Sequence, residues 1–318
     1  MKIHNKKIVC LGGGIGTSNL LRGLKKYQLD LSVVTSMVDD GGSSGRLRRS
    51  YGIMPPGDIV SCIAALAPDE QKELAELLIY RLPGVEKNGT GIGGHKLGNL
   101  IMLAEIFRTG DFYQAIEAVK KMCHVTANFF PATDERTHLH AITEDGRRIH
   151  RETTLDLALY SEPYGLKNIY ITPKKPKVNP KLIDAIMKAD VLISGPGDLY
   201  TNQLPVLVIP EIKEAILAAK AKKIFILNTT NKPFETKEFT LQHFVQAIID
   251  HLGVFPFDTI IANNNQSLPI PDEYDYHYVA IGDFSQKTFT LIAEDLVSKD
   301  FPIYHDPDRL ASVVMKQV

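Results

Sequence analysis

The sequence predicts an α/β fold with a mostly parallel sheet and a small inserted β-hairpin, and three observations favour this class. Short apolar runs with strand character alternate with stretches of helical spacing. The runs are nearly continuous in apolar residues, which is typical of parallel strands buried on both faces. Five of them end in glycine, amide or carboxylate residues. We expect a single domain over residues 1–318, with a β insertion at about 124–172.

Composition and charge argue against several classes of protein. The chain is 44% hydrophobic and 23% charged, and its net charge of −1 argues against a bulk electrostatic nucleic-acid binder. No apolar run approaches the roughly 18–20 residues that span a bilayer, and the run Ile8–Leu11 is too short for a signal peptide. Cys10, Cys62 and Cys123 form no paired motif, so we expect buried thiols and a cytoplasmic protein.

The first predicted strand, Lys7–Leu11, runs into a glycine-rich turn and then into a helical pattern. Such a turn gathers free N–H groups and the positive end of a helix dipole, which attract phosphate. The dinucleotide fingerprint fails because Thr17 stands at its last glycine position, and the P-loop fails for lack of G-K-[S/T]. A tight turn without a ligand is the alternative. The candidate nucleotide-binding residues here are Gly12, Gly13, Gly14, Gly16 and Thr17.

The stretch Met37–Asp58 follows a second predicted strand, Leu29–Thr35, and we interpret it as a glycine-rich ligand-binding loop. Its serines and arginines suit phosphate, whereas its paired carboxylates would repel phosphate unless they hold Mg²⁺, a sugar hydroxyl or an arginine. We expect Arg48 and Arg49 to be solvated or to face a partner. A long solvated turn is the alternative. The candidate nucleotide-binding residues are Asp39, Asp40, Ser43, Ser44, Arg46 and Asp58, with Asp39 or Asp40 as an alternative ligand for Mg²⁺.

Asp58 can also cap a helix that runs to Leu66, and Asp69–Leu82 predicts another helix. A second glycine-rich stretch, Gly89–Asn99, precedes the apolar helical pattern Leu100–Phe107. A lone histidine is usually structural or on the surface, but the glycines before His95 make a ligand role an equal alternative. The candidate residues at this turn are His95, Lys96 and Asn99.

Leu139–Thr143 and Arg147–His150 flank an Asp-Gly turn and predict a hairpin. His138, His140 and His150 alternate as strand neighbours do. No carboxylate or cysteine completes a metal set with them, so we expect exposed strand histidines. Pro173–Pro180 then predicts an extended, basic linker.

Strand and helix patterns alternate again after this linker. Strands are predicted at Asp190–Ser194, Lys223–Leu227 and Asp258–Ala262, and helices at Pro210–Ala221, at Leu241–Leu252 and from an Asp306 cap to Met315. The turns after these strands hold the candidate residues Gly195, Gly197, Asp198, Asn228, Thr229 and Asn263. Ligands bind at the carboxyl ends of strands in an open parallel sheet. The polar ends of five predicted strands therefore indicate one shared crevice.

Five segments carry a resemblance to a known family: GGGIG, VDDGGSSGRLR, GIMPPGDI, GHKLGN and GPGDLYTNQLP. With them the chain resembles the YvcK/CofD-like family, and within it the YvcK branch of gluconeogenesis factors. The resemblance implies a Rossmann-like three-layer αβα fold. It also implies binding of UDP-sugars such as UDP-N-acetylglucosamine, and a role in gluconeogenic growth, cell-wall synthesis and cell shape. A relative, 2-phospho-L-lactate transferase, moves a phospholactyl group from a guanosine-diphosphate-linked donor onto a deazaflavin.

Ile15, Asp198 and Asn202 differ from the residues common in that family, and Asp198 adds a carboxylate beside the expected phosphates. We favour a regulatory protein that binds a nucleotide sugar and a protein partner. Two alternatives stay open: a transferase acting on a nucleotide-diphosphate-linked donor with Mg²⁺, and an NAD-type dinucleotide-binding protein. The sequence shows no distinctive aromatic cluster for a flavin-like ring. We expect neither nucleic acid nor a membrane as a partner, and homo-oligomerisation is left open.

Overall fold

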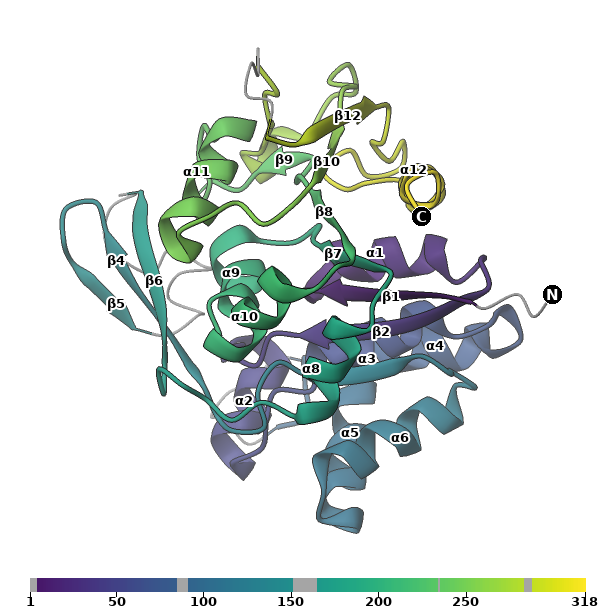
Figure 1. Cartoon of the computed structure of the whole chain (residues 1–318). Coiled ribbons are helices and arrows are strands. Elements are labelled where there is room, and N and C mark those ends of the chain that lie inside the picture. The colour runs from purple at the N-terminus through teal and green to yellow at the C-terminus, as the bar shows by residue number, and fades with distance from the viewer. Residues whose placement is uncertain (1–4, 85–90, 151–164, 234, 283–287) are drawn as a thin grey trace.

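Parallel strands form the central layer of the computed structural model, in which residues 5–84, 91–150, 165–233, 235–282 and 288–318 are described. Within these residues the main sheet has seven strands in the order β12-β10-β8-β7-β1-β2-β3 (Figure 1). Every neighbouring pair runs parallel. The strands are β1 (Lys6–Leu11), β2 (Leu29–Thr35), β3 (Asn128–Pro131), β7 (Val191–Ser194), β8 (Lys222–Ile226), β10 (Thr259–Asn263) and β12 (Thr290–Glu294).

Alternate side chains of each strand bury the two faces of this sheet in separate apolar cores. Val9 and Leu11 of β1 belong to one core, and Ile8 and Cys10 to the other. The first core is covered by α8 (Pro180–Met187), α9 (Leu204–Leu207), α10 (Pro210–Ala218) and α11 (Leu241–Leu252). The second is covered by α1 (Gly14–Leu24), α3 (Gly57–Leu66), α4 (Lys72–Ile79), α5 (Leu97–Thr109), α6 (Phe112–Met122) and α12 (Pro307–Met315). The expected three-layer αβα fold is confirmed.

The order of the strands places a topological switch point at the centre of the sheet. From the neighbouring strands β1 and β7 the order runs outward in two directions, through β2 on one side and through β8 on the other. Open α/β sheets bind ligands at such a point, outside the carboxyl ends of the strands. The turns after β1 and β7 touch there, since a Cβ on Gly16 would lie 2.5 Å from the carbonyl oxygen of Pro196. Glycine is the residue that allows this approach.

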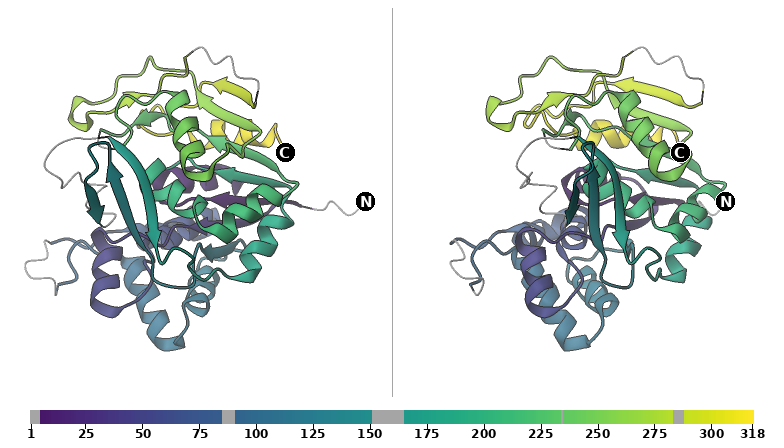
Figure 2. Two further views of the ribbon diagram at one scale, coloured as in Figure 1. Left: turned by 60° about the vertical axis from the view of Figure 1, so that its left-hand side comes forward. Right: turned by 90° about the vertical axis from the view of Figure 1, so that its left-hand side faces the viewer.

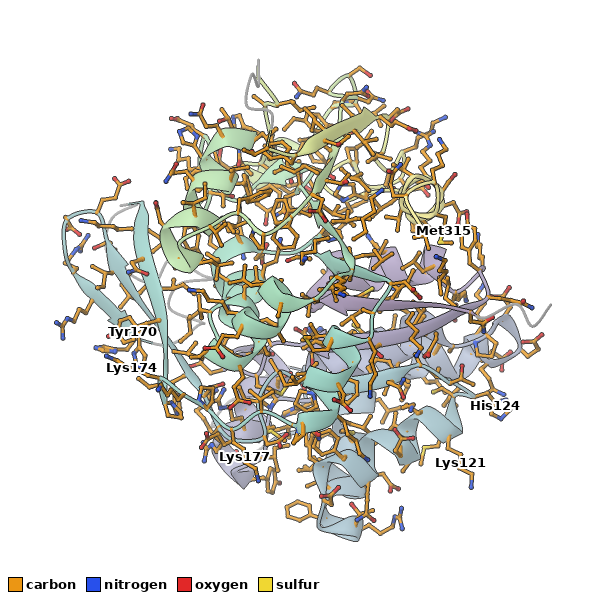
Figure 3. All side chains as sticks on the ribbon, in the orientation of Figure 1. Lys121, His124, Tyr170, Lys174, Lys177 and Met315 are labelled. Atoms are coloured by element: carbon orange, nitrogen blue, oxygen red, sulfur yellow. The ribbon has the colours of Figure 1, made fainter. Side chains whose placement is uncertain are left out.

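A small antiparallel sheet stands beside the main body (Figure 2). It contains β4 (His138–Thr143), β5 (Arg148–His150) and β6 (Leu166–Thr172) in the order β5-β4-β6, which confirms the predicted hairpin and adds a third strand. Strand β3, inside the range expected for the insertion, instead pairs with β2 of the main sheet. The linker that follows β6 bends at residues 173–175, so the predicted extended conformation does not hold there; it exposes Lys174 and Lys177 (Figure 3).

The hairpin histidines are only in part the exposed groups that the sequence predicts. His138 and His150 are exposed, but the ring of His140 is half-buried and stacks on Tyr170 with centroids 4.9 Å apart. Nδ1 of His140 lies 2.8 Å from Nδ1 of His150, so one of the two rings donates to the other. Among the described residues, no group of three or more His, Cys, Asp or Glu side chains could hold a metal ion.

The interpretation of Met37–Asp58 as a loop is wrong in its central part. Helix α2 (Gly42–Tyr51) occupies it, begins after Gly41 and ends at Gly52, whose left-handed conformation closes the last turn. The expected cap of the next helix is also wrong, because α3 is capped by Pro56 and Asp58 lies in its first turn.

Other helices and short elements follow the predictions more closely. The predicted helix from Asp69 to Leu82 is a 3₁₀ turn, Asp69–Gln71, followed by α4, while α11 and α12 have the predicted bounds. Short elements near the carboxyl edge are a π-helical turn (Leu199–Gln203), a 3₁₀ turn (Asp272–Tyr274) and the pair β9 (Thr230–Asn231) and β11 (His277–Tyr278). None of the described helices has the length and apolar content needed to cross a bilayer.

Candidate functional site

A cavity with a volume of about 860 Å³ lies at the carboxyl edge of the sheet, around the switch point. This size is typical of small-molecule sites. The predicted residues that line it are Gly13, Gly14, Gly16, Asp39, Ser43, Ser44, Asp58, Lys96, Asn99, Gly197, Asp198, Asn228 and Thr229. The predicted residues that do not line it are Gly12, Thr17, Asp40, Arg46, His95, Gly195 and Asn263.

Four helices direct their N-termini at one side of the cavity. Residues in the first turns of α1, α2, α3 and α5 all line it. Helices α1 and α2 begin after Gly13 and Gly41, with no side-chain cap and no acidic residue in the first turn. The first N–H groups of a helix have no partner within the helix, and together with the dipole they attract anions. We call this side the donor half; it comprises Gly13, Gly14, Gly16, Asp39, Gly41, Gly42, Ser43, Ser44, Asp58, Lys96 and Asn99.

Ser43 joins α2 to the start of α5. Its oxygen accepts hydrogen bonds from Nδ2 of Asn99 at 2.9 Å and from the backbone N–H of Lys96 at 3.3 Å. Nδ1 of His95 lies 2.9 Å from the same oxygen. Because two donors already point at this oxygen, its own proton is directed at His95, whose Nδ1 is therefore the acceptor. The side chains of Ser43 and His95 are thus used by protein contacts, whereas the backbone N–H groups of the first turns and the ammonium group of Lys96 are donors on this side of the cavity.

Two carboxylates, Asp39 and Asp58, line the donor half of the cavity. Burial, together with the neighbouring charge of Asp39, raises the pKa of Asp58 to about 6. The ammonium group of Lys96 opposes this rise, as do the N–H of Gly14 and the amide of Asn202, whose Nδ2 lies 3.4 Å from the Asp58 Oδ2 atom. The two carboxylates therefore repel one another across a site that a cation or a hydroxyl donor would stabilise.

The carboxylates that could hold Mg²⁺ are therefore Asp39 and Asp58; of the two predicted alternatives, Asp39 or Asp40, only Asp39 lines the cavity. Asp40 does not line the cavity, whereas Asp39 and Asp58 both do. Magnesium in nucleotide sites takes one or two carboxylates, and phosphate oxygens and water complete its octahedron. Asp39 and Asp58 supply that number of carboxylates beside the expected phosphates.

Aromatic side chains line the opposite side of the cavity. The rings of Phe301 and Tyr304 stack with centroids 5.5 Å apart, and Tyr274 contacts Phe301 at 5.6 Å and Tyr276 at 6.2 Å. Aromatic faces of this kind stack on nucleobases and pack against sugars. We call this side the tyrosine half; its cavity-lining residues are Thr229, Thr230, Tyr274, Tyr276, Ile303, Tyr304 and His305.

The sequence shows no distinctive aromatic cluster for a flavin-like ring, but the fold gathers aromatic residues that are scattered along the chain. Tyr274 and Tyr276 precede β11, whereas Tyr304 precedes α12. The segments D-E-Y-D-Y and I-Y-H-D-P, each next to a turn, were the signal available in the sequence.

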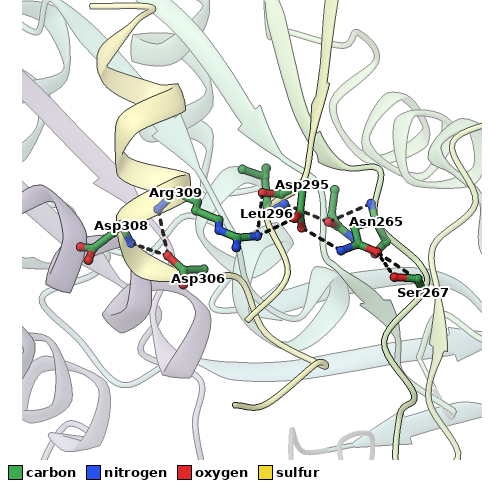
Figure 4. A network of polar contacts seen from close by, with 8 residues as sticks. Asn265, Ser267, Asp295, Leu296, Asp306, Asp308 and Arg309 are labelled. Carbon is green, nitrogen blue, oxygen red and sulfur yellow. Dashed lines mark hydrogen bonds and ion pairs between the residues drawn. The ribbon is translucent and has the colours of Figure 1, made fainter. Parts of the chain in front are cut away.

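A polar network fixes the segment that ends at His305 (Figure 4). Nη1 of Arg309 donates to Oδ2 of Asp295 at 2.6 Å, and Oδ1 of Asp295 accepts from Asn265 at 3.1 Å. The backbone N–H of Asp306 donates to the carbonyl of Leu296 at 2.7 Å. The chain between β12 and α12 is therefore held at both ends where it enters the tyrosine half.

Comparison with known proteins assigns the family. The family model described as 2-phospho-L-lactate transferase CofD matches residues 8–297. The chain belongs to the CofD family. It is 37% identical to the gluconeogenesis factor of Bacillus subtilis (strain 168) over 97% of both chains. It is 34% identical to the putative gluconeogenesis factor of Aquifex aeolicus (strain VF5), over 97% of this chain and 95% of that one.

The family fold is also seen in a solved structure. A crystal structure of a Bacillus halodurans protein, at 2.60 Å resolution, superposes with a TM-score of 0.89 and 33% identity. The superposition covers 98% of this chain and 99% of that chain.

Asp198 forms an ion pair. It is the residue that adds a carboxylate near the expected phosphates. Its Oδ2 lies 2.9 Å from Nζ of Lys232, a cavity-lining cation that the sequence analysis missed. The pair lies beside the β8–β9 turn, so Lys232 offsets the charge of Asp198. Further lining residues that were missed include Asn19, Ser36, Arg81, Thr201, Asn202 and Glu273.

Several predicted residues that do not line the cavity form hydrogen bonds within the protein. Oγ1 of Thr17 donates to the carbonyl of Pro196, and Nη2 of Arg46 donates to the carbonyl of Gly93 at 2.9 Å. Oδ1 of Asn263 accepts from the backbone N–H of Leu296 at 3.0 Å. These contacts join the turns around the cavity to one another.

The expectation that Arg48 is solvated is wrong. Its side chain is 2% exposed, and Nη1 donates to the carbonyls of Met37 at 3.0 Å and of Asp39 at 3.3 Å. Nη2 donates to the carbonyl of Thr137, just before β4. Arg49 is exposed, as expected, and its guanidinium donates to the carbonyl of Asp40. Arg48 therefore fixes the backbone that carries Asp39.

Proposed function

We propose that this protein is a nucleotide-sugar-binding regulator whose ligand resembles UDP-N-acetylglucosamine. The diphosphate lies against the first turns of α1 and α2 in the donor half. The uncharged parts of the ligand extend into the tyrosine half.

One observation carries this proposal: the cavity has two chemically different sides. Uncapped helix N-termini at Gly13 and Gly41 suit a diphosphate, and the tyrosine rings suit a base or a sugar. The volume of about 860 Å³ has room for a ligand of nucleotide-sugar size.

The wider role is part of the same proposal. The gluconeogenesis factors to which the chain is similar support a function in gluconeogenic growth. On the resemblance of its sequence motifs alone, we further propose that the protein acts in cell-wall synthesis and cell shape through a protein partner. The free and buried thiols of Cys10, Cys62 and Cys123 are in keeping with action in a reducing compartment.

Thermal unfolding with three candidate ligands tests the proposal. UDP-N-acetylglucosamine, NAD and GDP are compared at equal concentrations with the ligand-free protein. A ligand at about 100 times its dissociation constant stabilises the native state by about 2.7 kcal/mol, which raises the midpoint of a large domain by roughly 5–10 °C. We expect that rise with the UDP-sugar. No shift with any of the three would overturn the proposal, and a shift with NAD alone would favour the dinucleotide alternative.

A transferase is the second candidate, and the Asp39–Asp58 pair favours it together with the match to the transferase family. With Mg²⁺ bound, these carboxylates would hold the metal on the phosphates of a nucleotide-diphosphate-linked donor, and the metal would neutralise charge on the leaving group. Calorimetry with Mg²⁺ and with excess EDTA separates the two candidates. We expect UDP-sugar binding to survive EDTA. Strict metal dependence, with release of free nucleotide on long incubation, would favour the transferase.

A further inference from the structure

The tyrosine half contains buried polar atoms that have no partner in the described parts of the chain. They are Oγ1 of Thr229 and Nε2 of His305. Thr229 is 4% exposed and His305 is 3% exposed, yet both residues line the cavity. Buried polar groups in native proteins are nearly always hydrogen-bonded, and leaving one unpaired destabilises the protein. Because these atoms lie at the cavity, we infer that their hydrogen-bond partner is a bound ligand.

The hydrogen bonding of His305 defines what its free nitrogen needs. The imidazole donates a hydrogen bond to the backbone carbonyl of Leu227, at the end of β8. Because Nε2 has no partner, the donor is Nδ1, and Nε2 of the neutral ring carries a lone pair. Burial lowers the pKa of His305 to about 4, so the ring is neutral at physiological pH. Nε2 is therefore an acceptor.

The position of His305 is fixed before any ligand arrives. It forms an isolated bridge with Val297, and its neighbour Asp306 is hydrogen-bonded to Leu296. A rigid acceptor of this kind discriminates strongly between ligands, since a ligand without a matching donor leaves the acceptor unpaired in a buried site.

We propose that Nε2 of His305 accepts a hydrogen bond from an uncharged O–H or N–H group of the bound nucleotide sugar, and that His305 thereby selects the ligand. This inference rests on the proposed function and names the chemistry of one contact within it. The donor is a hydroxyl or acylamino N–H of the sugar, or an imide N–H of the base. A phosphate oxygen is excluded at this position because it is itself an acceptor.

Calorimetry with UDP-N-acetylglucosamine and with UDP tests the proposal in the wild type, His305→Phe, His305→Gln and His277→Phe. Phe removes the acceptor and keeps a ring of similar size. Gln keeps one donor for Leu227 and one acceptor for the ligand. His277 lies exposed on β11, outside the cavity lining, and provides the matched control. Circular dichroism checks that each variant is folded.

We expect His305→Phe to weaken binding of UDP-N-acetylglucosamine by roughly five- to hundredfold, and His305→Gln and His277→Phe to change it less than roughly threefold. Unchanged affinity for UDP in His305→Phe would place the donor on the N-acetylglucosamine, and an equal loss would place it on the uridine part of the ligand. If folded His305→Phe binds both ligands as the wild type does, the proposal is overturned.

Two remaining outcomes are also decisive. If His305→Phe does not fold, the comparison uses His305→Gln and the ¹⁵N resonance of Nε2 in the wild type. That resonance must shift on ligand binding, as expected for a nitrogen that accepts a hydrogen bond. An unchanged resonance overturns the proposal. If the wild type binds neither ligand, the proposed function fails, and this inference fails with it.

Discussion

At the scale of single residues, burial and the charge of Asp39 destabilise the ionised form of Asp58 in the donor half. Its carboxylate packs against the turn after β1, where a Cβ on Gly13 would lie 2.2 Å from Oδ2. The sequence identified Asp58 as a helix cap and ligand candidate, because its position after Pro-Pro-Gly is visible in the chain. Its proximity to Asp39 was not predictable, since that depends on how α3 packs beside the β2 turn.

Asp58→Asn should change how stability depends on pH. Because the native pKa of about 6 lies above the ordinary value of about 3.9, the native state binds more protons between these values, and the free energy of unfolding falls as pH rises through pH 4 to 6. The total loss is about 3 kcal/mol, of which about 1 kcal/mol falls between pH 5 and 7. The amide of the variant does not titrate, so this loss should disappear.

Urea unfolding at pH 5, 6 and 7 measures the effect in ligand-free protein, with Glu70→Gln on the exposed 3₁₀ turn as the control. Parallel stability curves for wild type and Asp58→Asn would contradict the assignment of a raised pKa to this carboxylate.

At the scale of elements, α2 is the part of the site whose secondary structure was wrongly predicted from the sequence. Its two glycine and three serine residues lower helix propensity, so the sequence of the segment is typical of a loop. Tertiary contacts overrule that preference. Gly45 lies so close to the turn before the helix that a Cβ would meet the Asp40 carbonyl oxygen at 1.8 Å, and Arg48 holds the carbonyls of Met37 and Asp39.

Other elements were predictable where local chemistry decides the structure. Helix α11 begins with a capping box at Thr240 and ends before Gly253, and α12 begins at an Asp306-Pro307 cap. Strand β12 (Thr290–Glu294) was missed because it lies at the sheet edge and is nowhere fully buried, and its apolar run is only Leu291–Ala293.

Arg48→Met should therefore destabilise the protein, because it removes the guanidinium donor of the Asp39 and Thr137 carbonyls, while the Met37 carbonyl keeps only the hydroxyl of Thr137. At about 1–3 kcal/mol for an unsatisfied buried group, we expect a loss of about 3 kcal/mol or more in the free energy of unfolding. Arg49→Met is the matched control on the same helix; it is exposed and should change stability by less than about 1 kcal/mol. Chemical denaturation of the two variants and the wild type measures the difference. Equal effects would show that Arg48 does not anchor α2.

At the scale of the whole molecule, the strand order dictates where a ligand binds but not what it is. The sequence placed polar turns at the carboxyl ends of five strands, and four of these turns, after β1, β2, β7 and β8, line the cavity. The turn after β10 does not line it, because Asn263 is bound to Leu296 there. The tyrosine half comes from long-range packing of two segments. Their tyrosines are visible in the sequence, but the meeting of the two segments at one cavity is not.

The central claim is that one ligand bridges the donor half and the tyrosine half. A crystal structure of the protein with UDP-N-acetylglucosamine tests it most directly. We predict that the diphosphate accepts hydrogen bonds from backbone N–H groups in the first turns of α1 and α2, and that the rest of the ligand contacts Tyr274, Tyr276 or Tyr304. Phosphates seated against the tyrosines, or a ligand bound outside this cavity, would contradict the account.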